Sequence, residues 1–394
     1  MYTTRPLSLY KNTPEAISIP PDGPNSGFLV LHDDESRPTI CFGLLPKYLN
    51  GYIPIKDLPF PQNKRLSISY STGNSTSHDE VYLIPIINRP LSANRYYAIK
   101  ADGTQRGKAY ASSKAEDEGV SCCVFPYIPD VKPRAFDPKD KYQQFEFYEA
   151  SVTQGCLTRN MMLAKSIEFD GHPPLFLRRK GWHICGRPLK YPTLEEAGGL
   201  DSSLRAQLPD FDFPSSKECS NSVIVGKWYC PFMFIKEGRE KDQVKYSVFY
   251  EMTLEQRWLR IFAADQRNYT NQGKIVKVDV VVPTEIVKIV GQEAVREERN
   301  DDNVVMWFNR RGTGVGLSSL IIERMVWEEE RVGWVKENDK RVRVVKNDEY
   351  VGIGDWTSYG CYLLVETFVL KRNDGSVLLT YDFRHTHHIR SKWE

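Results

Sequence analysis

Short apolar runs separated by turn residues dominate the first 150 residues. The runs occupy residues 28–31, 40–45, 66–70, 81–87 and 95–100. Runs of this length, rich in β-branched and aromatic residues, are typical of strands. The prolines between them, such as Pro20, Pro21 and Pro24, remove backbone donors and end the preceding element. The pattern predicts a small antiparallel sheet domain with few helices.

The second half of the chain combines strand patterns with helix starts. Residues 223–235 and 246–252 predict adjacent antiparallel strands, and residues 274–290 predict two β-branched strands divided by Pro283. Thr193 with Glu196, and Thr253 with Gln256, match the capping box that opens a helix. The second of these helices would place Leu254, Trp258, Ile261 and Phe262 on one side.

The C-terminal segment repeats the order of an earlier one. Lys236, Tyr246 and Trp258 recur 135 positions later as Lys371, Tyr381 and Trp393. A fixed offset indicates an internal duplication, although chance matches of common residues would give the same pattern. The sequence therefore predicts an α+β, mostly antiparallel fold. Its parts are a β-rich N-terminal domain at residues 1–150 and two related sheet-plus-helix units at residues 151–272 and 273–394.

Composition and charge restrict the partners and the compartment. The 53 Lys and Arg residues against 51 Asp and Glu give a net charge of +2, which supplies no general field for nucleic acid or an anionic membrane. The chain shows no signal-peptide core and no apolar stretch near the ~20 residues that span a bilayer. A soluble cytoplasmic or nuclear protein is expected. None of the eight cysteines forms a C-x-x-C pair, so buried thiols are expected rather than a zinc site.

Several sequence blocks carry a family resemblance. The blocks at residues 1–16, 88–100, 173–182, 226–238, 249–258 and 380–394 resemble the plant family catalogued as domain of unknown function 1262. The resemblance implies a plant protein found among stress- or defence-responsive genes, and it transfers no catalytic residue. This chain has His388 and Ser391 where similar members usually have Gln and Cys, which argues against an essential role for either position.

A glycine cluster is the strongest candidate for binding an anion. Gly312, Gly314 and Gly316 follow a predicted strand at residues 304–308 and precede a predicted helix start at Ser318. Backbone amides of such a loop approach a phosphate or carboxylate, with help from Arg310 and Arg311. If the duplication holds, Arg178 lies at an equivalent strand end and joins this anion site. The alternative is a turn beside an exposed arginine pair, because the spacing falls short of the dinucleotide fingerprint.

Two histidines near the C-terminus form a second candidate. On a strand, His385 and His387 would face one way and share a metal ion or a proton-transfer task. They supply two ligands with no assignable third, so structural or surface histidines are the alternative. The charged run at residues 328–331 is expected to be a solvated face.

These observations leave the biochemical activity open. The leading hypothesis is a soluble protein that acts by binding a small molecule or a protein partner in plant stress or defence. The alternative is an enzyme acting on a small plant metabolite, with its site between the two repeated units. The sequence identifies no cofactor, no metal site and no nucleic-acid partner.

Overall fold

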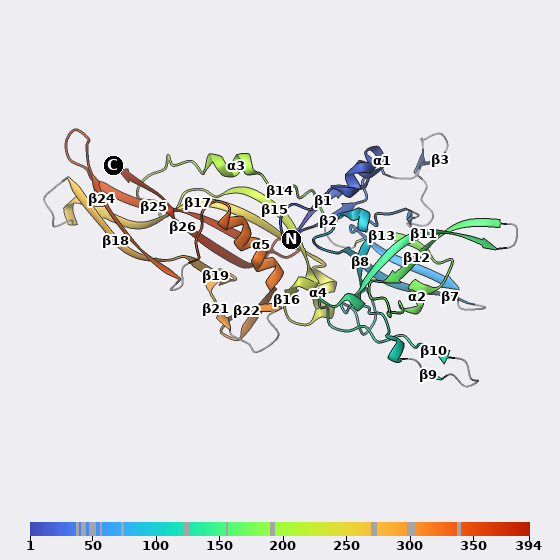
Figure 1. Ribbon diagram of the computed structural model, residues 1–394. Helices are drawn as coiled ribbons and strands as arrows, with labels where there is room; N and C mark the ends of the chain where they lie inside the picture. Colours follow the sequence, from blue (N-terminus) through green and yellow to red (C-terminus); the bar gives the residue numbers. More distant parts are fainter. Residues whose placement is uncertain are drawn as a thin grey trace. The chain divides into compact units, whose positions relative to one another are not determined.

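The computed structural model is mostly β (Figure 1). It describes residues 1–36, 39–40, 45–46, 53–55, 57–71, 75–117, 119–120, 126–154, 157–189, 194–268, 274–297, 304–336 and 340–394. Of these residues, 48% lie in strands and 16% in helical segments. The predicted α+β fold with two sheet-plus-helix units is therefore wrong.

The second predicted helix shows how the error arose. Residues 253–262 belong to strand β17 (Phe249–Asp265) and not to a helix. Leu254 and Trp258 are both buried, and residues four apart share a face in a strand as well as in a helix. The spacing of these apolar residues therefore did not distinguish a strand from a helix.

The chain folds into two compact units, which are described separately. Unit 1 contains residues 1–196 and 229–249, and unit 2 contains residues 197–228 and 250–394. The predicted domain boundaries at residues 150 and 272 fall inside these units. The proposed duplication stays a prediction.

Unit 1 is built around a seven-stranded sheet. In spatial order its strands are β12 (Leu157–Ser166), β11 (Gln144–Gln154), β8 (Arg95–Lys100), β7 (Thr76–Pro85), β6 (Lys64–Ser71), β13 (His183–Pro188) and β5 (Ile53–Ile55). The shorter strands of this unit are β1 (Tyr2–Pro6), β2 (Gly27–Leu31), β3 (Thr39–Ile40), β4 (Leu45–Pro46), β9 (Gly119–Val120), β10 (Pro126–Tyr127) and β16 (Ile235–Lys236). Its helices are α1 (Leu7–Asn12), α2 (Leu175–Arg178) and α4 (Glu240–Tyr246), with 3₁₀ turns at Pro14–Ser18, Leu91–Ala93, Ala115–Asp117, Lys141–Gln143 and Phe232–Phe234.

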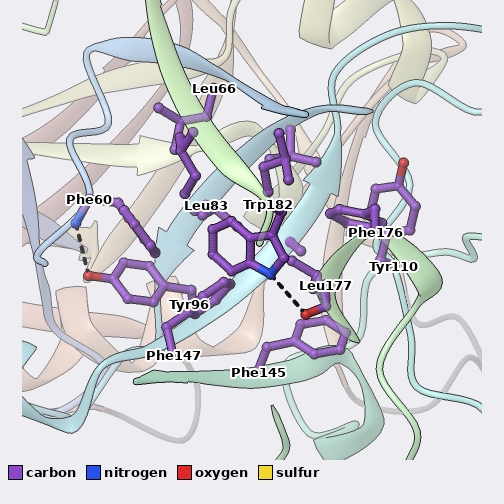
Figure 2. Close-up of a cluster of buried hydrophobic side chains, with 14 residues drawn as sticks. Phe60, Leu66, Leu83, Tyr96, Tyr110, Phe145, Phe147, Phe176, Leu177 and Trp182 are labelled. Atoms are coloured by element: carbon purple, nitrogen blue, oxygen red, sulfur yellow. Dashed lines mark hydrogen bonds between the residues drawn. The ribbon is translucent and has the colours of Figure 1, made fainter. Parts of the chain in front are cut away.

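Aromatic side chains form the core beneath this sheet (Figure 2). Phe147 meets the rings of Phe60, Tyr96 and Trp182 edge to face, at centroid distances of 5.1, 5.6 and 6.2 Å. The Trp182 indole donates a 3.1 Å hydrogen bond to the carbonyl of Leu177, so its polar atom is satisfied inside the core.

Unit 2 is organised around three long antiparallel strands. These are β17, β25 (Ser358–Lys371) and β26 (Val377–Trp393). They are extended by residues 223–228 of β15 (Val223–Pro231) and by β14 (Gly199–Leu200) on one side, and by β19 (Glu285–Ile289) and β20 (Gln292–Glu293) on the other. The hairpin between β25 and β26 turns at Asn373-Asp374-Gly375, where Gly375 adopts φ +81°. This turn confirms the sequence prediction, since a positive φ suits glycine.

Both faces of β25 are covered, which explains why its residues are almost all buried. On one face, Leu363 and Val365 pack against Val282 and Val344 of the two-stranded sheet β18 (Ile275–Pro283) and β24 (Arg341–Glu349). On the other face, Leu364 packs with Phe213 and other aromatic residues. The remaining elements of unit 2 are β21 (Val295–Glu297), β22 (Val305–Arg310), β23 (Thr313–Ser318), α3 (Ser202–Gln207), α5 (Ser319–Glu330) and a 3₁₀ turn at Gln266–Asn268.

Candidate functional site

A buried polar cluster lies on the face of the β17–β25–β26 sheet that β18 and β24 leave uncovered. Strand pairing sets Gln256 opposite Glu366, and Leu364 opposite His385. Residues directly opposite each other in an antiparallel pair point to the same side of the sheet. Gln256, Glu366 and His385 are each 1% exposed. Three neighbouring strands therefore present polar groups to one interior space.

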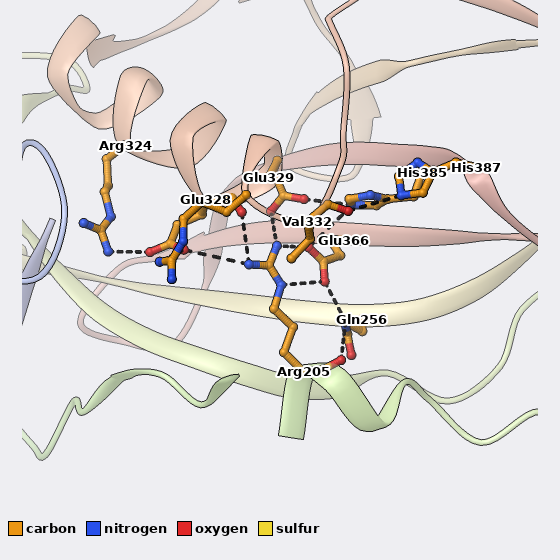
Figure 3. Close-up of polar contacts among 10 residues, drawn as sticks. Arg205, Gln256, Arg324, Glu328, Glu329, Val332, Glu366, His385 and His387 are labelled. Carbon is orange, nitrogen blue, oxygen red and sulfur yellow. Dashed lines mark hydrogen bonds and ion pairs between the residues drawn. The ribbon is translucent and has the colours of Figure 1, made fainter. Parts of the chain in front are cut away.

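Helix α3 contributes the arginine that binds this cluster. The N-cap of this helix is Asp201, whose side chain accepts a 2.9 Å hydrogen bond from the Leu204 amide. Arg205 contacts both carboxylate oxygens of Glu366, through Nε at 3.0 Å and through a second guanidinium nitrogen. It also donates to the Glu328 carbonyl at 3.0 Å and to Glu329 at 3.3 Å (Figure 3). A forked guanidinium suits such bidentate contact.

Helix α5 supplies two more carboxylates from the opposite side. Glu328 and Glu329 are both 0% exposed, so the prediction that residues 328–331 form a solvated face is wrong for these two residues, whereas Glu330 and Arg331 are exposed. Arg324 pairs with Glu328 one turn away, and Arg331 contacts the same carboxylate at 3.4 Å. Buried carboxylates are tolerated when they are paired and hydrogen-bonded. In the sequence, a buried run of charged residues looks the same as a solvated run, because the partners that allow burial lie elsewhere in the chain.

The environment separates the pKa values of the acidic groups. Burial, together with the charge of Glu366, raises the pKa of Glu329 to about 8. Burial opposes ionisation of Glu366 too, but hydrogen bonds from His385 and Arg205 outweigh it and lower the pKa of that carboxyl. His385 Nε2 lies 2.9 Å from Glu329 and 3.5 Å from Glu366. Burial disfavours the imidazolium, but these carboxylates raise the pKa of His385 to about 9.

A bulge in β26 decides where the histidines lie. Leu363 pairs with Ile389 whereas Leu364 pairs with His385, so residues 386–388 have no partner on β25. Bulges re-aim side chains next to functional sites. His387 Nε2 contacts the carbonyl of Val332 at 3.2 Å, whereas His385 is buried beside Glu329. The rings of His385 and His387 remain 5.4 Å apart, and a shared task for the two stays a prediction.

A cavity of about 310 Å³ adjoins the cluster. Its walls combine apolar and polar side chains, and the residues that line it are Leu200, Ser202, Arg205, Ala206, Leu208, Gln256, Arg331, Val332, Leu364, Glu366, His385 and His388. Among the described residues, Gln256 Oε1 and His385 Nδ1 are buried without a hydrogen-bond partner. Both belong to residues of this lining, so the cavity offers polar capacity that the protein does not use itself.

The cluster also satisfies the distance condition for a metal site. One ligand atom each from Glu329, Glu366 and His385 lies within 4.8 Å of the others. Two carboxylates and an imidazole are a set that zinc accepts. Arg205 already contacts both carboxylates, and His385 Nε2 is directed at Glu329. These cationic groups neutralise the carboxylates, and we therefore assign no ion here.

The predicted anion site is distributed over two units. Arg178 is the last residue of α2 in unit 1, where it contacts Asp130 at 3.1 Å and the Ile128 carbonyl at 3.0 Å. Arg310 ends β22 in unit 2, and Arg311 and Gly312 form the β22–β23 turn with φ of 45° and 85°. The structure does not place the two arginine pairs at equivalent strand ends.

The glycines of this motif belong to a hairpin. Gly314 and Gly316 lie in β23, paired opposite Asn309 and Trp307. Helix α5 nevertheless begins at Ser319 with Ser318 in the N-cap position, as predicted. A strand therefore separates the Gly312 turn from the helix, and the helix N-terminus does not follow the turn directly. Anion binding at Arg310, Arg311 and these glycines stays a prediction.

Fold and site together define a mostly β protein with a buried ionic cluster beside a small pocket. The model of a family described as a protein of unknown function, DUF1262, matches residues 22–124. No curated protein matches the chain. The crystal structure of Cry35Ab1 is similar at 12% sequence identity, covering 85% of this chain and 90% of that one. The TM-score between the two structures is 0.43. No described helix is long and apolar enough to cross a membrane.

Sequence reasoning missed most of this site. Arg205, Gln256, Glu329 and Glu366 are common surface residue types, and no motif connects them. One signal was present: Glu366 interrupts the apolar run of residues 361–370. A carboxylate in a strand buried on both faces requires a partner, and the partner was Arg205.

Proposed function

We propose that this protein acts by binding a small organic molecule in the cavity of unit 2. The observation that carries the proposal is the cavity itself, in which apolar side chains lie beside the buried polar cluster. A few polar groups among apolar walls are the usual composition of a ligand site, and about 310 Å³ is at the small end of such sites. The plant stress or defence setting and the cytoplasmic or nuclear location implied above belong to the same proposal.

The burial of the polar cluster favours ligand binding over catalysis. Glu366 and His385 are 1% exposed, and Glu329 is not exposed. Each is held by partners within the protein, among them Arg205. Groups that are rigid and already paired orient a ligand without reorganising, which keeps the entropic cost of binding low.

The test is to block the cavity without disturbing the cluster. Ala206 lines the cavity and is exposed on α3, and its neighbour Gln207 is exposed but does not line it. Wild type, Ala206→Phe and Gln207→Phe would be incubated as full-length protein with a broad plant metabolite extract and compared by native mass spectrometry. We expect a bound small molecule on wild type and Gln207→Phe, and its loss from Ala206→Phe. A wild-type chain that retains no molecule, or equal retention by both variants, contradicts the proposal.

Acid–base catalysis is a second candidate, favoured by the opposite pKa shifts of Glu329 and Glu366. Environments that push two carboxyl groups apart are typical of acid and base pairs. Here Glu329 is the group that keeps its proton near neutral pH, with a pKa of about 8. Conversion of any extract metabolite by wild type but not by Glu329→Gln would support this function. Identical metabolite profiles with and without the protein would exclude it for that extract.

A further inference from the structure

Of the two arginines that line the cavity, Arg331 has more unused hydrogen-bonding capacity. Its guanidinium carries five N–H donors, and among the described residues its side chain has one polar contact, to Glu328 Oε2 at 3.4 Å. Glu328 is shared, because Arg324 pairs with the same carboxylate and Arg205 lies 3.8 Å from it. Three guanidinium groups therefore lie within ion-pair distance of one carboxylate. Of the three arginines, Arg331 is the one whose side chain is exposed at the surface.

Arg331 is also held in position at the cavity. Its guanidinium lies over the Trp327 ring at 4.5 Å, a cation–π contact that restrains the group. Its side chain is 45% exposed, compared with 5% for Arg205, and it lines the cavity. A ligand can therefore reach this guanidinium without breaking the buried network.

The rest of the cavity lining indicates the other features of a ligand. Leu200, Leu208 and Leu364 supply apolar wall, which suits a hydrocarbon or aromatic body. Gln256 Oε1 accepts no hydrogen bond from the described residues, although the Gln256 amide nitrogen donates to Glu366 at 2.6 Å. A buried acceptor without a partner costs free energy, and a ligand hydroxyl that donates to it would recover that cost.

We infer that the cavity takes a small hydroxylated organic acid, with its carboxylate on Arg331, its apolar body against the leucines and its hydroxyl on Gln256. This inference rests on the proposed function and specifies the class of ligand. A carboxylate matches the guanidinium fork through two parallel hydrogen bonds. Burial lowers the pKa of the cavity residue His388, and the charges of His385 and Arg390 lower it further, although the charge of Glu366 opposes them. The unused donors of Arg331 therefore favour an anion over a neutral or cationic ligand.

Matched pairs of acids and amides test the inference. The probes are 4-hydroxybenzoate, 4-hydroxyphenylacetate and 3-(4-hydroxyphenyl)propanoate, each with its neutral primary amide of nearly the same shape. Binding to the full chain would be measured by titration calorimetry. The variants are Arg331→Gln and the control Arg341→Gln, which removes an exposed charge of β24 that does not line the cavity. A thermal melt of each variant confirms that it is folded.

We expect at least one acid to bind wild type about tenfold or more tightly than its amide, as a charge-assisted hydrogen bond requires. Arg331→Gln should remove this preference, and Arg341→Gln should keep it. Equal binding of acids and amides, a preference that survives in Arg331→Gln, or no binding of any probe overturns the inference. The proposed function fails separately, if the extract experiment yields no molecule that Ala206→Phe excludes.

Discussion

His385 Nε2 lies 2.9 Å from a carboxylate oxygen of Glu329, and both side chains are buried between strand β26 and helix α5. A contact of this kind couples proton binding to folding. Arg205, Glu328 and Glu366 also belong to the cluster, and His387 and His388 stand on the adjoining bulge. The stability of the protein should therefore depend on pH in a defined direction.

The free energy of unfolding should fall as the pH rises from about 6.5 to about 9. The unfolded chain releases the His385 proton near the ordinary histidine pKa of 6.5, whereas the folded chain keeps it until the pH reaches about 9. The pKa of Glu329, raised to about 8, acts in the same direction. The loss for His385 is on the order of 3 kcal/mol. Urea unfolding at several pH values would measure it, with His385→Gln showing a shallower dependence. Stability that stays constant or rises across this range would contradict the shifts.

Removing Arg205 should destabilise the protein strongly. Arg205→Met leaves Glu366 and Glu329 buried without their guanidinium partner, and breaking a buried pair from one side costs about 3–5 kcal/mol. Arg343→Met is the matched control, since Arg343 pairs with Asp279 on the exposed face of β24. We expect a large drop in the urea midpoint for the first variant and little change for the second. Equal effects would show that burial of the cluster is not what makes it stabilising.

Deleting residues 386–388 should restore an uninterrupted ladder between β25 and β26. With those residues absent, Ile389 directly follows His385, and the pairs Leu364–His385 and Leu363–Ile389 become consecutive. The deletion removes the His387 contact with Val332, so the free energy of unfolding should stay within about 1 kcal/mol of wild type. It also reshapes the cavity, because His388 is part of its lining. Cooperative unfolding with loss of ligand binding is the expected result. Failure to fold would show that the bulge is structural.

Gly333 should tolerate a side chain less well than Gly354. Both adopt φ near +90°, where any L residue is strained by on the order of 1 kcal/mol. A Cβ at Gly333 would lie 3.2 Å from His387 Nε2, whereas one at Gly354 meets nothing within 4 Å. Gly333→Ala should therefore cost about 1 kcal/mol more than Gly354→Ala, as the His387 hydrogen bond is displaced. Thermal denaturation of the two variants measures the difference, and equal values would remove the His387 contact as a constraint.

Local sequence patterns predicted several elements correctly. The strands on either side of Pro283, the turn at Asn373-Asp374-Gly375 and the helix start at Ser318 are all present. Each of these depends on a few adjacent residues, through β-branching, positive φ or capping. Such preferences act over short distances and are therefore visible in the chain itself.

The features that local patterns did not predict depend on residues that are distant in the sequence. Burial of Glu328 and Glu329 depends on Arg205, more than 120 positions away, and on how α5 packs against the sheet. The position of His385 depends on a bulge that only the pairing of β25 with β26 reveals. The sequence by itself determined short strands and turns, because backbone preferences belong to neighbouring residues. The tertiary structure alone decided which charges are buried and which side chains share a pocket, because the energy of a charge is set by the groups folding brings around it.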